Sequence, residues 1–77
     1  MRKMAEAEIK GIAETIAPQT SERFTTVVFQ DGTIEAVEGS WLGYRNVWVI
    51  VQGKAEAGEL YAQLLQSYNE IQYCQGW

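Results

Sequence analysis

The hydrophobic positions of this chain follow a helical period at both ends and a strand-like pattern in the middle. From Arg2 to Ala17 apolar residues recur every three or four positions, as on one face of an α-helix, and Pro18 ends that helix. The same period returns from about Lys54 to Tyr73 and predicts a second helix with a broad apolar face. The stretch between them, Phe24 to Gln52, is rich in β-branched and aromatic residues and predicts strands.

A β-hairpin is predicted by the dipeptide Asp31-Gly32, which stands between two extended runs and is typical of a two-residue type I′ turn. With that loop Phe29 pairs with Ile34, and Val27 pairs with Ala36. Paired residues share a face, so these four residues form a plain core face. The opposite face mixes polar side chains with an apolar set, which consists of Phe24, Val28 and Val37.

A third strand is predicted from Asn46 to Gln52, and it is apolar on both sides. Strands of this kind are normally covered on both faces. The connection that precedes it, Gly39 to Arg45, contains Trp41 and Tyr44 and is expected at the surface. Alternatively, Trp41 begins an early third strand with a bulge at Gly39. The side chains of the third strand divide into Val47, Val49 and Val51 on one side and Trp48 and Ile50 on the other.

These elements predict an α+β fold in the order helix, three-stranded antiparallel meander, helix (αβββα), with residues 1–77 as a single small domain. Two helices side by side span roughly 20 Å and three strands about 14 Å, so both helices are expected on one sheet face. The other face is then open and displays apolar side chains that a monomer rarely leaves to water. Either a homodimer packing sheet on sheet or a dedicated protein partner would cover it. The residues predicted for this open face are Phe24, Val28, Val37 and Trp48.

Catalytic chemistry has few candidate residues in this chain. Histidine is absent, which removes Ser-His and Cys-His pairs and the commonest metal ligand. Asp31, Glu35 and Glu38 fall close together, but Asp31 is explained by its turn and the two glutamates fall on opposite strand faces. The single cysteine, Cys74, has no neighbouring basic cluster to activate it. We therefore expect no enzyme activity, no metal and no cofactor.

The acidic balance belongs to one part of the chain. Residues 1–29 are neutral, whereas residues 30–77 hold six acids and two bases and account for the whole net charge of −4. This is either a solvated surface or an acidic patch that docks a basic partner, such as a nucleic-acid-binding protein whose cationic groove it would occupy. The charged residues concerned are Asp31, Glu35, Glu38, Glu56, Glu59 and Glu70 against Arg45 and Lys54.

Direct binding to nucleic acid or to a membrane is not expected. The element order resembles that of double-stranded RNA-binding domains, but those depend on a basic start to the final helix, whereas here Lys54 is followed by Glu56 and Glu59. No apolar run approaches the roughly 20 residues of a membrane span, and the acidic amphipathic start is unlike a signal peptide. With a lone cysteine, the chain is expected in the cytoplasm.

Aromatic and arginine side chains of the kind that dominate binding hot spots gather in the connection and at the C-terminus. Trp48 is the most core-like of the aromatic residues. The chain is interpreted as a non-catalytic protein-binding module, and in style it resembles small inhibitors encoded by phages and mobile elements, such as anti-CRISPR and anti-restriction proteins. The alternative is an assembly subunit that forms an obligate homo-oligomer through the open face. The residues predicted to contact a partner are Trp41, Tyr44, Arg45, Glu35, Glu38 and Trp77.

Overall fold

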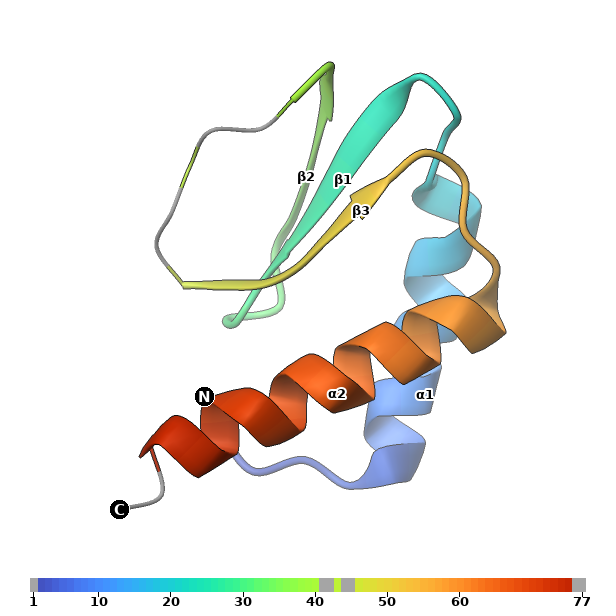
Figure 1. The fold of residues 1–77 in the computed structure, drawn as a ribbon. Coiled ribbons are helices and arrows are strands. Elements are labelled where there is room, and N and C mark those ends of the chain that lie inside the picture. Colours follow the sequence, from blue (N-terminus) through green and yellow to red (C-terminus); the bar gives the residue numbers. More distant parts are fainter. Residues whose placement is uncertain (1, 41–42, 44–45, 76–77) are drawn as a thin grey trace.

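The computed structural model describes residues 2–40, 43 and 46–75 and has the expected αβββα order of an α+β fold (Figure 1). Both helices cover the same face of an antiparallel sheet. A short 3₁₀ turn, η1, follows the first helix. The elements are α1 (Glu6–Ile16), η1 (Ala17–Gln19), β1 (Phe24–Phe29), β2 (Ile34–Glu38), β3 (Val47–Gln52) and α2 (Ala57–Gln75).

The strands lie in the order β2-β1-β3, so β1 is central and β2 and β3 form the two edges. A meander would have placed the second strand in the centre. Because β2 and β3 both run antiparallel to β1, they are parallel to each other. The connection between them therefore starts and finishes at opposite ends of β1. At its start the Thr25 hydroxyl donates to the carbonyl of Gly39, and at its finish the Gln30 N–H donates to the carbonyl of Asn46 at 2.7 Å.

The hairpin turn has three residues where two were expected. The Gly32 N–H donates to the Phe29 carbonyl and the Phe29 N–H to the Thr33 carbonyl, both at 2.9 Å. Gly32 has a φ of 93°, whereas Asp31 has none of the positive φ that a type I′ turn requires. The sequence-based turn type is therefore wrong, and every pair between β1 and β2 moves by one residue, so that Val28 lies opposite Ile34.

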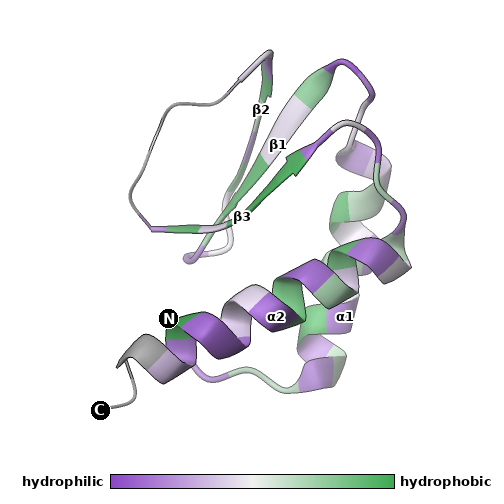
Figure 2. Cartoon of the chain, viewed as in Figure 1, coloured by the Kyte–Doolittle hydropathy of each residue, from purple (hydrophilic) through white to green (hydrophobic). Residues whose placement is uncertain are grey.

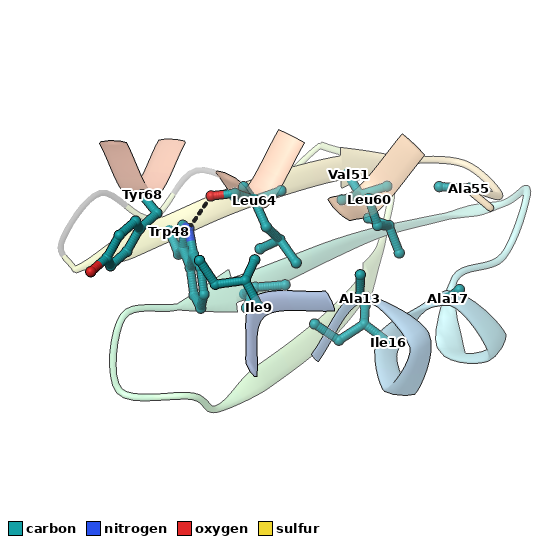
Figure 3. Packing of buried hydrophobic residues seen from close by; sticks show 12 residues of the cluster. Ile9, Ala13, Ile16, Ala17, Trp48, Val51, Ala55, Leu60, Leu64 and Tyr68 are labelled. Atoms are coloured by element: carbon teal, nitrogen blue, oxygen red, sulfur yellow. Dashed lines mark hydrogen bonds between the residues drawn. The ribbon is translucent and has the colours of Figure 1, made fainter. Parts of the chain in front are cut away.

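A hydrophobic core lies between the helices and the sheet (Figure 3). Its side chains interdigitate from both helices and from the inner face of the sheet, and burying each large one stabilises the fold by about 1.5–3 kcal/mol. Figure 2 shows that β3 is hydrophobic along most of its length. The residues of this core include Ile9, Ala13 and Ile16 of α1, Leu60, Leu64 and Tyr68 of α2, and Val28, Trp48, Val49 and Val51 of the sheet.

A β-bulge at Trp48 decides which side chains of β3 are buried. Val28 lies opposite Val49 and Phe29 lies opposite Val47, which leaves Trp48 as the extra residue. Trp48 and Val49 are consequently both buried, and the Trp48 indole N–H donates to the Leu64 carbonyl at 3.0 Å (Figure 3). Val28 and Trp48, which the sequence assigned to the open face, thus belong to the helix-side core.

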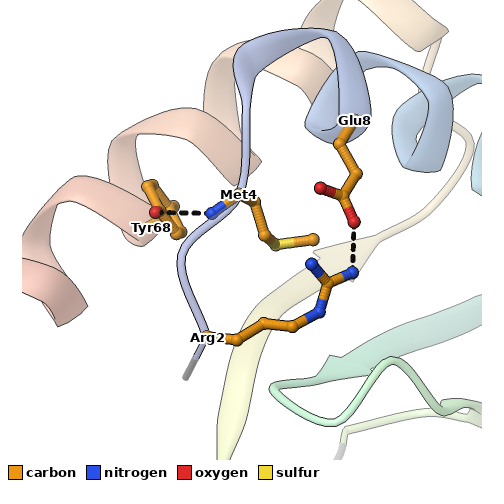
Figure 4. A network of polar contacts seen from close by, with 4 residues as sticks. All are labelled: Arg2, Met4, Glu8 and Tyr68. Atoms are coloured by element: carbon orange, nitrogen blue, oxygen red, sulfur yellow. Dashed lines mark hydrogen bonds and ion pairs between the residues drawn. The ribbon is translucent and has the colours of Figure 1, made fainter.

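The N-terminal segment runs extended along α2, so α1 begins at Glu6 and not near Arg2 (Figure 4). The Met4 N–H donates to the Tyr68 hydroxyl at 2.9 Å, and Arg2 pairs with Glu8 of α1. These contacts give the Met4 N–H and the Arg2 side chain partners outside a helix. They also join the first residues of the chain to the last helix.

Candidate protein-binding surfaces

Two backbone hydrogen bonds define which strand residues face the edges of the sheet. The Gly53 N–H donates to the Phe24 carbonyl at 3.0 Å, and the Phe29 N–H donates to Thr33 in the hairpin. Along a strand the backbone N–H and C=O groups point alternately to its two sides. In β1, the backbone groups of Phe24, Thr26 and Val28 therefore hydrogen-bond to β3. Those of Thr25, Val27 and Phe29 hydrogen-bond toward β2 and the hairpin. The outer backbone groups, which point away from β1, are therefore those of Ile34, Ala36 and Glu38 on β2 and those of Ile50 and Gln52 on β3.

The β2 edge is acidic. Glu35 and Glu38 are both exposed. Glu35 lies opposite Val27, on the face turned away from the helices, and Glu38 lies opposite Phe24, on the helix side. Arg23 is 3.9 Å from Glu38, but both side chains are largely exposed, so this ion pair contributes little. The two carboxylates are accessible from both faces of the edge strand.

Asp31 has a structural role in the hairpin. Its Oδ1 accepts a hydrogen bond from the Thr33 N–H at 3.0 Å and another from the Thr33 hydroxyl at 2.7 Å. These bonds lower the pKa of the Asp31 carboxyl below its ordinary value. The local geometry supports the sequence-based interpretation of Asp31 as a turn residue.

The residues predicted for one open sheet face lie on both faces of the sheet in the structure. Phe24 is 38% exposed at the start of β1, and Val37 is half-buried on the face turned away from the helices. Val28 and Trp48 are in the core, as described above. On the face turned away from the helices Val27 is fully buried, and the exposed apolar side chain there is Ile50, at 47%.

Four of the predicted partner contacts, Trp41, Tyr44, Arg45 and Trp77, lie outside the described residues. Their assignment stays a prediction. Gly39 and Ser40, which lead from β2 toward three of them, are both exposed.

The β3 edge was missed by sequence reasoning. Its residues, Val47–Gln52, include no charge and no proline. Beside it lies a shallow groove of about 390 Å³ between β3 and α2. The charge pattern could have identified β2 as an edge, because charged residues favour edge strands, but it does not distinguish β3 from β1, since neither carries a charge. The groove is lined by Val47, Trp48, Val49, Ile50, Gln63, Gln66, Ser67 and Glu70.

The described part of the chain shows neither a metal site nor a membrane-spanning helix. Within residues 2–40, 43 and 46–75, no three Cys, Asp or Glu residues stand close enough to hold a metal ion. None of the helices there combines the length and apolarity needed to cross a bilayer. Comparisons with protein-family models, with curated proteins and with solved structures give no match. The edges of the sheet are therefore the features on which a functional argument can be built.

Proposed function

We propose that this protein is a non-catalytic protein-binding module that occupies a basic surface of a partner protein. The observation that carries the proposal is the β2 edge, where Glu35 and Glu38 are exposed on opposite faces of an outer strand. A stable monomeric fold needs neither carboxylate, since neither lies in the core. Carboxylates on both faces of one edge suit a partner whose cationic groove receives that edge.

Electrostatics favours this kind of partner. The chain has a net charge of −4, and residues 30–77 carry all of it. A concentrated negative field steers a basic partner toward the binding surface and raises the association rate, more strongly at low salt. A nucleic-acid-binding protein has such a cationic groove, so the proposed class is an inhibitor of the anti-CRISPR or anti-restriction type, encoded by a phage or mobile element and acting in the cytoplasm.

The aromatic residues of the connection complete the proposed surface. Trp41, Tyr44 and Arg45 follow Glu38 and Gly39 closely in the sequence. Aromatic and arginine side chains supply most of the affinity of protein interfaces, whereas exposed carboxylates mainly supply attraction and orientation. Truncating Trp41 or Tyr44 to alanine is therefore expected to weaken partner binding by more than about 1 kcal/mol each.

The proposal is tested by parallel affinity capture from a lysate of the native host. The wild-type protein and an E35Q/E38Q variant are used as baits, and the captured proteins are compared by mass spectrometry. We expect a basic protein that the wild type retains and the variant loses. Stoichiometric wild-type protein should then lower the activity of that isolated partner.

A matched control is the E14Q/E22Q variant, which removes the same charge from two exposed positions outside β2. It should capture the partner as the wild type does. If all three baits capture the same proteins equally, or if the partner's activity is unaffected, the proposed function is wrong.

The alternative function is an assembly subunit that binds only further copies of itself. The exposed Ile50 on the face turned away from the helices favours it. An assembly subunit would capture no partner in the experiment above, so the same measurement separates the two functions.

A further inference from the structure

The two edges of the sheet differ in a way that points to self-association at one of them. The β2 edge has charged side chains at Glu35 and Glu38, and such charges discourage strand pairing. The β3 edge has no such protection. An uncharged, mostly apolar outer strand is a template on which another strand can add.

We propose that β3 pairs antiparallel with β3 of a second copy of this chain, with the two-fold axis at Ile50. The alternation of hydrogen bonds turns the N–H and carbonyl of Ile50 away from β1, so two copies can exchange both bonds at this residue. The same operation pairs Val49 with the partner's Val51. The pair is isologous, as most homodimers are.

The side chains near the axis fit this arrangement. Ile50 is 47% exposed, and in the dimer it lies beside its own copy on the face turned away from the helices, where water is displaced from both. On the helix side, the groove between β3 and α2 gives room for the second copy. The polar residues that line that groove are mostly uncharged, namely Gln63, Gln66 and Ser67, and Glu70 is the charged exception.

Apolar self-pairing favours a second copy as the occupant, because a two-fold axis at Ile50 sets Ile50 against its own copy and Val49 against the partner's Val51. Two copies of a chain with a net charge of −4 repel each other, and they approach at least cost where neither presents a charge. Among the described strands, the uncharged outer strand is β3. The paired copies form a continuous sheet whose two outer strands are both β2, so the dimer presents two acidic edges. The inference does not rest on the proposed function, because it leaves β2 free.

Sedimentation velocity over about 5 to 500 µM tests the dimer. The wild type should change from monomer to dimer within this range, and I50K should stay monomeric throughout, since it places two like charges at the axis. The matched control is A36K, which adds the same charge at an exposed position on the β2 edge and should dimerise as the wild type does. A wild type that stays monomeric, or an I50K variant that dimerises normally, would overturn the proposal.

A crosslink tests the position of the axis and does not depend on the folding of the lysine variant. Ile50→Cys is made in a Cys74→Ser background and oxidised. Hydrogen-bonded antiparallel partners have Cα atoms about 5.5 Å apart, which a disulfide spans, so a covalent dimer should form. Ala36→Cys in the same background should not crosslink. Crosslinking at Ala36 without crosslinking at Ile50 would assign the contact to the wrong edge and overturn the proposal.

Discussion

At the scale of the residue, Thr26 is a buried polar side chain whose hydroxyl makes, within the part of the chain that the structure describes, none of the contacts that would offset its burial. It is fully buried, and among the described residues its hydroxyl has no hydrogen-bond partner. Burying a hydroxyl without a partner costs about 1–3 kcal/mol. Its neighbour Thr25 is also buried, but the Thr25 hydroxyl donates to Gly39.

Replacing Thr26 by valine is expected to raise the free energy of unfolding by about 1 kcal/mol, because the hydroxyl is removed while the β-branched shape is kept. Thr25→Val is the matched control and should lower it by a similar amount, since a satisfied hydrogen bond is lost. Urea titrations with equal m-values measure both changes. Loss of stability in both variants would show that the Thr26 hydroxyl has a partner after all.

The turn residue Asp31 is expected to make the stability of the fold depend on pH. Hydrogen bonds from Thr33 lower the pKa of Asp31 in the folded state. A lowered folded pKa gives stability that is present above the ordinary pKa and is lost as pH falls through the folded value. Stability of the Asp31→Asn variant should therefore fall less steeply below about pH 4 than that of the wild type. Glu8, whose pKa is lowered by Arg2, is kept in both proteins, so parallel curves would exclude this role for Asp31.

At the scale of the element, the helices follow from hydrophobic period, and the number of strands follows from β-branched and aromatic composition together with the Asp31-Gly32 turn signal. The hairpin register does not, because Asp31-Gly32 suits both a two-residue turn and a three-residue loop with glycine in the left-handed region. That difference of one residue moved Val28 from the expected open face into the core.

Some other features of the sheet could be predicted from the sequence, and one could not. Glu35 and Glu38 mark the second strand as an edge, and this argues against a meander. The bulge at Trp48 has no signal in the sequence, since it depends on packing against α2. Strand alternation did predict Ile50 on the side opposite Val49 and Val51, and that side is turned away from the helices.

The contact between the N-terminal segment and α2 predicts a difference between two tyrosines. Tyr68 accepts from the Met4 N–H in a partly buried site, whereas Tyr61 donates to Glu6 at 3.2 Å at the surface. Tyr68→Phe should cost about 1 kcal/mol of unfolding free energy and speed amide exchange at Met4. Tyr61→Phe should change both much less. Equal effects would mean that the segment is not held by Tyr68.

At the scale of the whole molecule, the sheet has a central β1 flanked by two unlike edges. The acidic β2 edge is proposed for a basic partner and the uncharged β3 edge for a second copy. Sequence patterning alone placed the glutamates on opposite faces of their strand, but the identity of the edges required the strand order.

Amide hydrogen exchange, followed residue by residue by NMR over a range of protein concentrations, tests this most directly. The amides of Val27 and Val28 should be protected at every concentration, that of Ile50 should become protected as concentration rises, and that of Ala36 should exchange freely throughout. Protection of Ala36 at low concentration, together with an Ile50 amide that exchanges freely at all concentrations, would contradict the account.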